Sequence, residues 1–153
     1  MRNKKQLLLE QLNQKLDKFT DAKSVQLPEK GWIYTIRTTI NMTRLQLGLK
    51  LGSTKGAVQK IEEREATGQI SVNKLRAVAE ALDLQLVYGF VPKDGSLDQL
   101  IKRKAEELAQ KIVLRTHQNM RLEDQGIEGG KVDKAIKDLT EELSREVRRS
   151  LWD

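Results

Sequence analysis

Residues 42–62 have the sequence MTRLQLGLKLGSTKGAVQKIE, which is the most informative stretch of the chain. It predicts two short helices joined by a tight turn. Thr43 and Gln46 have the spacing of a capping box, which begins the first helix. Gly52 ends that helix, because glycine adopts a positive φ without strain. Ser53 or Thr54 then caps the second helix.

Further helices are predicted on both sides of this pair. Apolar residues at helical spacing indicate an amphipathic helix over residues 5–20, and Pro28 lies in a linker over residues 21–30. From Gly31 a helix with Trp32 on its apolar stripe runs to Asn41. Ser71 caps another helix, which ends near residue 82.

Residues 84–91, Leu-Gln-Leu-Val-Tyr-Gly-Phe-Val, are rich in β formers and are followed by Pro92. They predict one β-strand. A lone strand has unpaired edges and needs a partner, either the same strand of a second copy or a strand of another protein.

The remainder predicts a helical hairpin. Ser96 and Gln99 form a second capping box before a long amphipathic helix that reaches Met120, and glycines separate it from a last helix over residues 132–151. Those glycines are Gly126, Gly129 and Gly130. The predicted fold class is therefore mainly α with one strand, in three parts: residues 1–30, 31–92 and 93–153.

The positive charge is concentrated in the first part of the chain. The net charge is +6, and residues 1–93 hold 16 basic and 9 acidic side chains against 12 and 13 in residues 94–153. Between Lys30 and Ile61 there are six basic residues and no acidic one. Such a bias attracts phosphate backbones through counterion release, so it favours nucleic-acid binding.

Several classes of function find no support in the residues. The chain has no cysteine, and a single histidine, His117, does not form a metal site or a catalytic triad. There is no glycine-rich phosphate loop and no apolar run long enough to span a membrane. We therefore expect a cytoplasmic protein that is not an enzyme, with no catalytic residue, metal or cofactor.

Helix, tight turn and helix is the arrangement of DNA-binding helix-turn-helix proteins. The segment resembles the phage-repressor (Xre, Cro-type) family in Thr43, Arg44, Leu47 and Gly52, and then in a second set of residues. These are Thr54, Lys55, Val58, Ile61 and Glu62. It departs from that family at Gly48, usually alanine, and at Gly56, usually polar. The resemblance implies a lambda-repressor-like domain over residues 31–83, in which Glu62 makes a structural ion pair.

The predicted DNA-binding residues are Arg44, Thr54, Lys55, Gly56, Gln59 and Lys60. Lys55 is expected to contact guanine O6 and N7, or failing that a phosphate, and Gln59 adenine N6 and N7. Arg44 is expected to hold a phosphate without distinguishing sequence. Gly56 allows close approach of the backbone.

Arg37 and Lys50 are expected to add to the positive field rather than to make contacts. Because two recognition helices must enter successive major grooves roughly 34 Å apart, we expect a homodimer on a palindromic operator in double-stranded DNA.

The chain also resembles, along its whole length, the bacterial family named mobile mystery protein A. The resemblance is carried by Gly31-Trp-Ile, Ala79-Glu-Ala-Leu-Asp83, Leu86-Val-Tyr88, Val91-Pro92, Met120-Arg-Leu-Glu-Asp-Gln125 and Leu151-Trp-Asp153. It implies an antitoxin-like repressor encoded beside a Fic-domain partner.

Two alternatives remain open from the sequence. The first is an antidote protein that neutralises the Fic-type partner by direct binding through the near-neutral helices after Ser96. The second, RNA binding, is disfavoured because the basic window holds only two aromatic residues, Trp32 and Tyr34.

Overall fold

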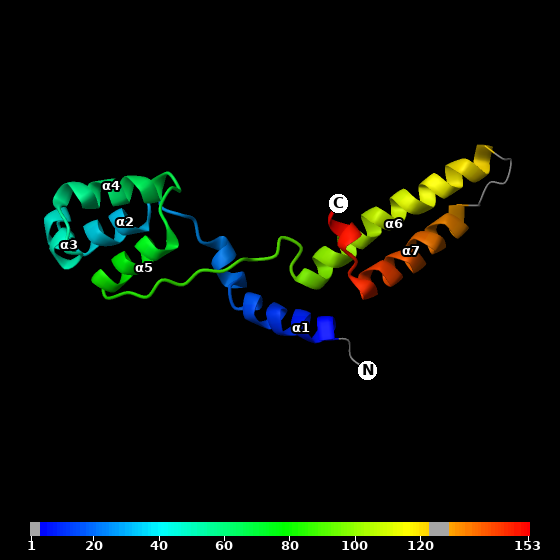
Figure 1. Cartoon of the computed structure of the whole chain (residues 1–153), viewed down its shortest axis with the longest axis horizontal. Coiled ribbons are helices and arrows are strands. Elements are labelled where there is room, and N and C mark those ends of the chain that lie inside the picture. Colours follow the sequence, from blue (N-terminus) through cyan, green and yellow to red (C-terminus); the bar gives the residue numbers. More distant parts are fainter. Residues whose placement is uncertain (1–3, 123–128) are drawn as a thin grey trace. The chain divides into compact units, whose positions relative to one another are not determined.

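The structure is a computed structural model that describes residues 4–122 and 129–153. Its fold is mainly α (Figure 1), and no described residue lies in a β-strand. The α-helices are α1 (Lys4–Asp17), α2 (Trp32–Thr39), α3 (Arg44–Lys50), α4 (Lys55–Ala66), α5 (Val72–Ala81), α6 (Leu97–Leu122) and α7 (Gly129–Glu146). Two short 3-10 helices, η1 (Thr20–Ser24) and η2 (Arg149–Trp152), complete the described elements. Of the glycines predicted to separate the last two helices, Gly126 lies outside the described residues, as do Glu123–Gln125 of the motif quoted above. Gly129 and Gly130, in contrast, do not break the helix but are the first two residues of α7.

The chain divides into two compact units. One is Ser24–Gly89, which contains α2 to α5, and the other joins Met1–Lys23 with Phe90–Asp153. The N-terminal helix, which the sequence suggested as a separate part with its linker, thus groups with the C-terminal hairpin.

The helices of the Ser24–Gly89 unit begin at the residues that the sequence indicated. Thr43 caps α3 with a complete capping box: its hydroxyl accepts from Gln46 N at 3.1 Å, and Gln46 Oε1 accepts from Thr43 N at 2.8 Å. Thr54, rather than Ser53, caps α4, and Ser71 caps α5. Each cap satisfies an amide that the helix itself leaves without a partner.

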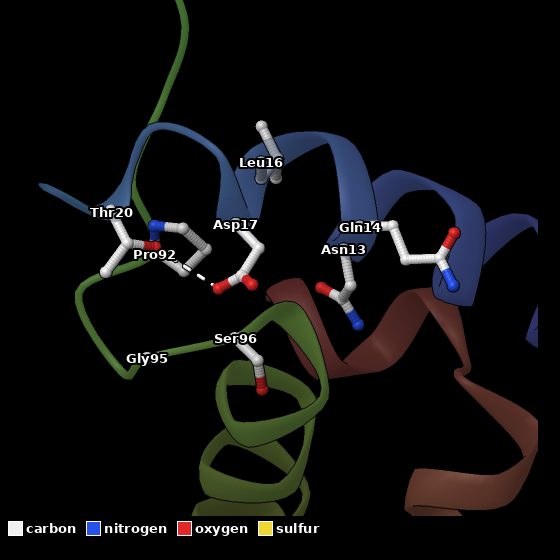
Figure 2. Close-up of a pocket in the computed structure, with 8 residues that line it drawn as sticks. All are labelled: Asn13, Gln14, Leu16, Asp17, Thr20, Pro92, Gly95 and Ser96. Carbon is white, nitrogen blue, oxygen red and sulfur yellow. Dashed lines mark hydrogen bonds between the residues drawn. The ribbon is translucent and has the colours of Figure 1, made fainter. Parts of the chain in front are cut away.

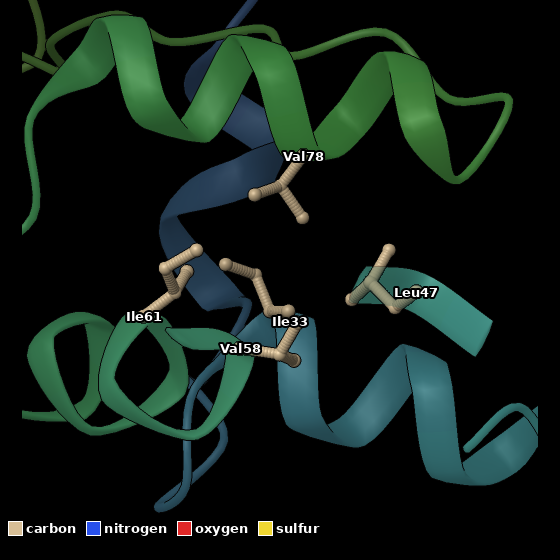
Figure 3. Packing of buried hydrophobic residues seen from close by; sticks show 5 residues of the cluster. All are labelled: Ile33, Leu47, Val58, Ile61 and Val78. Carbon is tan, nitrogen blue, oxygen red and sulfur yellow. The ribbon is translucent and has the colours of Figure 1, made fainter. Parts of the chain in front are cut away.

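One apolar cluster holds these four helices together. Figure 3 shows its side chains converging from α2, α3, α4 and α5. Its members are Ile33, Leu47, Val58, Ile61 and Val78. Leu47 and Val58 are fully buried, so the α3–α4 pair is fixed by side chains from both of its helices.

Three residues set the geometry between α2, α3 and α4. Asn41 (φ 60°) ends α2, and Gly52 (φ 63°) ends α3, as the sequence predicted. Gly48 lies where α3 meets the start of α4. A Cβ added there would lie 3.1 Å from the backbone oxygens of Ser53 and Thr54, closer than such contacts usually are. An alanine at this position would therefore require these backbone atoms to shift by a few tenths of an ångström.

The other unit is built on the hairpin of α6 and α7. Its buried cluster combines residues of both helices with Leu151 of η2, which is only 4% exposed. The members are Ile101, Ala105, Ala109, Leu143 and Leu151.

Helix α1 joins this unit through Asn13. Its Oδ1 accepts from the backbone N–H of Leu97 at 3.0 Å, and its Nδ2 donates to Asp98 Oδ2 at 2.9 Å. Asn13 therefore provides a hydrogen-bond acceptor for a backbone N–H in the first turn of α6, which the helix itself leaves unpaired. A helix cap has the same role. Figure 2 shows Asn13 projecting from α1 at this corner, with Ser96 at the start of α6.

Two predicted elements differ from the structure. Residues 84–91 form no strand in the single chain, because a strand requires a hydrogen-bonding partner and none is present among the described residues. The last helix ends at Glu146 instead of residue 151. Val147 adopts φ 46°, and the chain then turns so that Leu151 packs against the cluster.

Trp32 also differs from its prediction. It was placed on the core stripe of its helix, but it is 40% exposed. Ile33, its neighbour, fills the core position instead.

Candidate nucleic-acid interface

The first two turns of α4 carry predicted DNA-binding residues on the surface. Lys55, Gly56, Gln59 and Lys60 are all exposed, together with the capping residue Thr54. Lys55 and Gln59 are four residues apart, as are Gly56 and Lys60, so the members of each pair lie one above the other on the helix. We call these five residues the α4 face. Val58 and Ile61 lie on the opposite, buried side, which fixes the orientation of the helix.

Two members of the α4 face already make hydrogen bonds within the chain. The hydroxyl oxygen of Thr54 accepts from the backbone N–H of Ala57 at 3.1 Å, so this residue organises the start of the helix. Gln59 Nε2 donates to Glu63 Oε1 at 3.3 Å. That bond leaves the Gln59 carbonyl oxygen and one amide hydrogen for another partner.

The two lysines of the α4 face carry uncompensated charge. Within the described part of the chain, neither Lys55 nor Lys60 forms an ion pair. An exposed ammonium without a carboxylate partner retains its full attraction for phosphate.

Arg44 lies at the start of α3, close to this face. Its Nε is 3.5 Å from Glu62 Oε2, and its side chain is 30% exposed. The same Nε is buried without a hydrogen-bond partner among the described residues. Arg44 is thus only loosely held by the interior.

An open hollow connects Arg44 with Lys55. We call it the basic hollow; its lining residues come from α2, α3, the turn between them and the first residue of α4. They are Tyr34, Arg37, Thr38, Asn41, Met42, Thr43, Arg44 and Lys55. Two cations predicted separately from the sequence therefore share one concave surface.

Arg37 departs from its expected role. The sequence suggested a contribution to the positive field, but Arg37 is buried and its guanidinium pairs with Glu62 at 2.7 and 3.2 Å. A third bond runs from Nη1 to the backbone oxygen of Met42 at 2.9 Å. The carboxylate neutralises the arginine, so this group ties α2 to α4 and adds little to the positive field. The ion pair of Glu62 that the family resemblance implied is present.

Sequence patterns did not indicate the polar and aromatic lining of the basic hollow. Thr38 and Asn41 reach it only because α2 ends beside α3. The Tyr34 ring has two cationic groups near it. Lys30 Nζ lies 4.8 Å from the ring centroid, and the Arg37 guanidinium carbon lies 5.5 Å from it. Of these three lining residues, only Asn41 had a local sequence signal, because the sequence predicts that it ends its helix.

Within residues 4–122 and 129–153, no three or more acidic or histidine side chains gather as a metal site would require. No helix in these residues has the length and apolar character to cross a membrane.

Comparisons with protein-family models, curated proteins and solved structures found no match to this chain.

Proposed function

We propose that this chain is a sequence-specific DNA-binding protein in which α3 and α4 form a helix-turn-helix. The observation that carries the proposal is the α4 face, exposed and cationic, joined through the basic hollow to Arg44. A helix supported from behind by Val58 and Ile61 offers its first turns to the major groove. Arg44 holds a phosphate, and Lys55 and Gln59 contact base edges.

The proposed biological role is that of an antitoxin-type autorepressor. In this role the protein binds a palindromic operator as a homodimer and represses its own operon, as the resemblance to mobile mystery protein A implies. This step rests on that resemblance and on the symmetry of DNA sites.

Selection of bound duplexes from random DNA tests the proposal. The full chain should enrich a palindromic motif, and should bind it at least about a thousandfold more tightly than unrelated DNA at moderate salt. Equal affinity for selected and unrelated duplexes would show that the protein is not sequence-specific.

Arg44→Ala should weaken binding to every duplex by a similar factor, roughly tenfold for one lost charged hydrogen bond. It should also reduce the salt slope of log K by about 1. Fluorescence anisotropy over a range of salt concentrations measures both. Lys50→Ala on the same helix is the matched control, because Lys50 does not line the basic hollow. Equal losses in the two variants would contradict a phosphate contact by Arg44.

Gly56→Ala separates folding from binding. Nothing lies within 4 Å of a Cβ added at Gly56, so alanine should stabilise α4 by roughly 0.5–1 kcal/mol. If the backbone at Gly56 approaches DNA closely, the same methyl group weakens operator binding. Thermal unfolding and anisotropy on one preparation measure the two effects. A variant that is more stable and binds DNA normally would remove Gly56 from the interface.

A second candidate function is an antidote role toward a Fic-type partner. Ile112 and Leu114 of α6 are 44% and 46% exposed, and nothing in the proposed DNA contact uses them. Co-expression of the full chain with the product of the neighbouring gene tests this role. Loss of protection in Ile112→Lys, with retention in Arg44→Ala, would support it, and the opposite pattern would contradict it.

A further inference from the structure

Most backbone hydrogen-bonding groups of the segment after α5 have no backbone partner among the described residues. Leu84 N donates to Ala79 O at 2.7 Å, and the next backbone bond along the chain runs from Gly95 N to Pro92 O at 3.2 Å. Between them, residues 85–91 make no backbone–backbone hydrogen bond within the described part of the chain. An extended run of free N–H and C=O groups is a template for another strand.

Most side chains of this segment are apolar, and several of these are highly exposed. Val87 is 65% exposed, Tyr88 60% and Phe90 80%. Large apolar residues grouped in this way on a surface indicate a contact with another molecule.

Residues 84–88 of the segment are nevertheless held on the Ser24–Gly89 unit, to which they belong. Residues 84–87 line a hollow of about 320 Å³ together with apolar residues of α2 and α5, among them Trp32 and Leu75. Tyr88 Oη accepts from Arg76 Nη2 at 3.3 Å, and the guanidinium carbon lies 5.6 Å from the ring centroid. These contacts fix the position of residues 84–88 on their unit, while Val87 and Tyr88 stay exposed to a partner.

We infer that residues 85–91 pair antiparallel with the same residues of a second copy, with Tyr88 opposite the partner's Tyr88 on the twofold axis. The charges at the ends of the segment favour this occupant. Residues 84–92 carry no charge, whereas Asp83 precedes them and Lys93 follows. Both charges are five residues from Tyr88, so antiparallel pairing puts Asp83 opposite the partner's Lys93 at each end. Parallel pairing in register would instead place like charges together.

The same register also gives suitable positions to Leu86, Phe90 and Pro92. Leu86 lies opposite the partner's Phe90 on the face that carries the Tyr88 pair, because side chains alternate along a strand. Pro92, which has no N–H, falls at the end of the ladder, where proline is tolerated. The strand that the sequence predicts then forms only in the dimer, which accounts for its absence from the single chain. The choice of a second copy rests in part on the proposed function, since a palindromic site requires twofold symmetry.

Disulfide trapping in the full-length protein tests this pairing. The chain has no cysteine, so one introduced cysteine forms a disulfide only with another copy. Residues directly opposite in an antiparallel pair have Cα atoms about 4.5–5.5 Å apart, within the range of a disulfide. Tyr88→Cys should form a covalent dimer under mild oxidation at micromolar concentration. Asn73→Cys, exposed on α5, should remain monomeric on a non-reducing gel.

Val87→Cys tests the register. In the inferred pairing two residues at position 87 are diagonal neighbours about 7–8 Å apart, so this variant should cross-link more slowly than Tyr88→Cys. Faster cross-linking at position 87 would overturn the register. Equal cross-linking of Tyr88→Cys and Asn73→Cys would overturn the pairing itself.

Sedimentation velocity of the unmodified protein provides a second readout, independent of the cysteine substitutions. It should show a dimer, and Tyr88→Lys, which opposes two ammonium groups on the twofold, should shift it toward monomer. A monomer at all accessible concentrations would overturn the inference. A monomer that still prefers its selected operator would overturn this pairing but not sequence-specific DNA binding. A dimer that shows no DNA preference would overturn the proposed function but not this pairing.

Discussion

Glu62→Gln is expected to lower the free energy of unfolding of the Ser24–Gly89 unit by about 3–5 kcal/mol. Glu62 is 3% exposed, and its carboxylate receives two hydrogen bonds from Arg37, itself 6% exposed. Arg44 Nε lies 3.5 Å from the same carboxylate. The glutamine side chain has nearly the same shape but no charge, so two guanidinium groups lose their counter-ion, one of them in the interior. Charge loss, rather than a cavity, is the cause of the expected effect.

Urea unfolding monitored by the fluorescence of Trp32 measures this change. A Trp152→Phe background removes the second tryptophan, which belongs to the other unit. Glu63→Gln is the matched control, since Glu63 is exposed on the same helix and should change the stability by less than about 0.5 kcal/mol. Similar small effects in both variants would mean that the Arg37–Glu62 pair does not hold α2 to α4.

Leu47→Ala should destabilise the same unit by about 2–5 kcal/mol. Leu47 is completely buried and contributes from α3 to the cluster of Ile33, Val58, Ile61 and Val78. Removing its branched end leaves a cavity between α3 and α4, and the orientation of the α4 face depends on that packing. Operator binding should therefore fall at temperatures near the lowered midpoint of unfolding.

Leu49→Ala is the matched control for this variant. Leu49 lies on the same helix and is 71% exposed, so the same substitution removes no core contact. The quantity to compare is the loss of unfolding free energy in Leu47→Ala relative to that in Leu49→Ala. Equal destabilisation would show that α3 does not pack as described.

Local signals were sufficient for most helix ends in the Ser24–Gly89 unit. Thr43 with Gln46, Ser71, Asn41 and Gly52 act through hydrogen bonds or φ values within a few residues, so sequence spacing alone predicts them. The family resemblance also included Leu47 and Val58, and both are fully buried in the core.

Contacts between residues far apart in the chain were less predictable. Arg37 was expected to add to the positive field, because an arginine within a basic window gives no sign of a carboxylate 25 residues later. The family pattern pointed to Glu62 but did not supply its partner. Asn13 gave no signal at all, since its role depends on α6, more than 80 residues away.

Backbone geometry beyond the local pattern explains the remaining differences. The apolar period of the last helix continues to Leu151, but the turn at Val147 redirects the chain after Glu146. The composition of residues 84–91 favours a strand, yet composition does not specify whether a partner is present in the same chain.

The most direct test of the central claim is a comparison of the DNA sequence preference of Gln59→Ala with that of the unmodified protein. Both are used to select bound duplexes from the same random library, with Gln69→Ala as a control in the exposed loop after α4. If α4 lies in the major groove, Gln59→Ala should lose its preference at one base pair in each half-site, at about 1–3 kcal/mol of discrimination, while the other positions stay unchanged. A sequence preference identical in all three proteins would contradict the account, because the α4 face would then take no part in distinguishing bases.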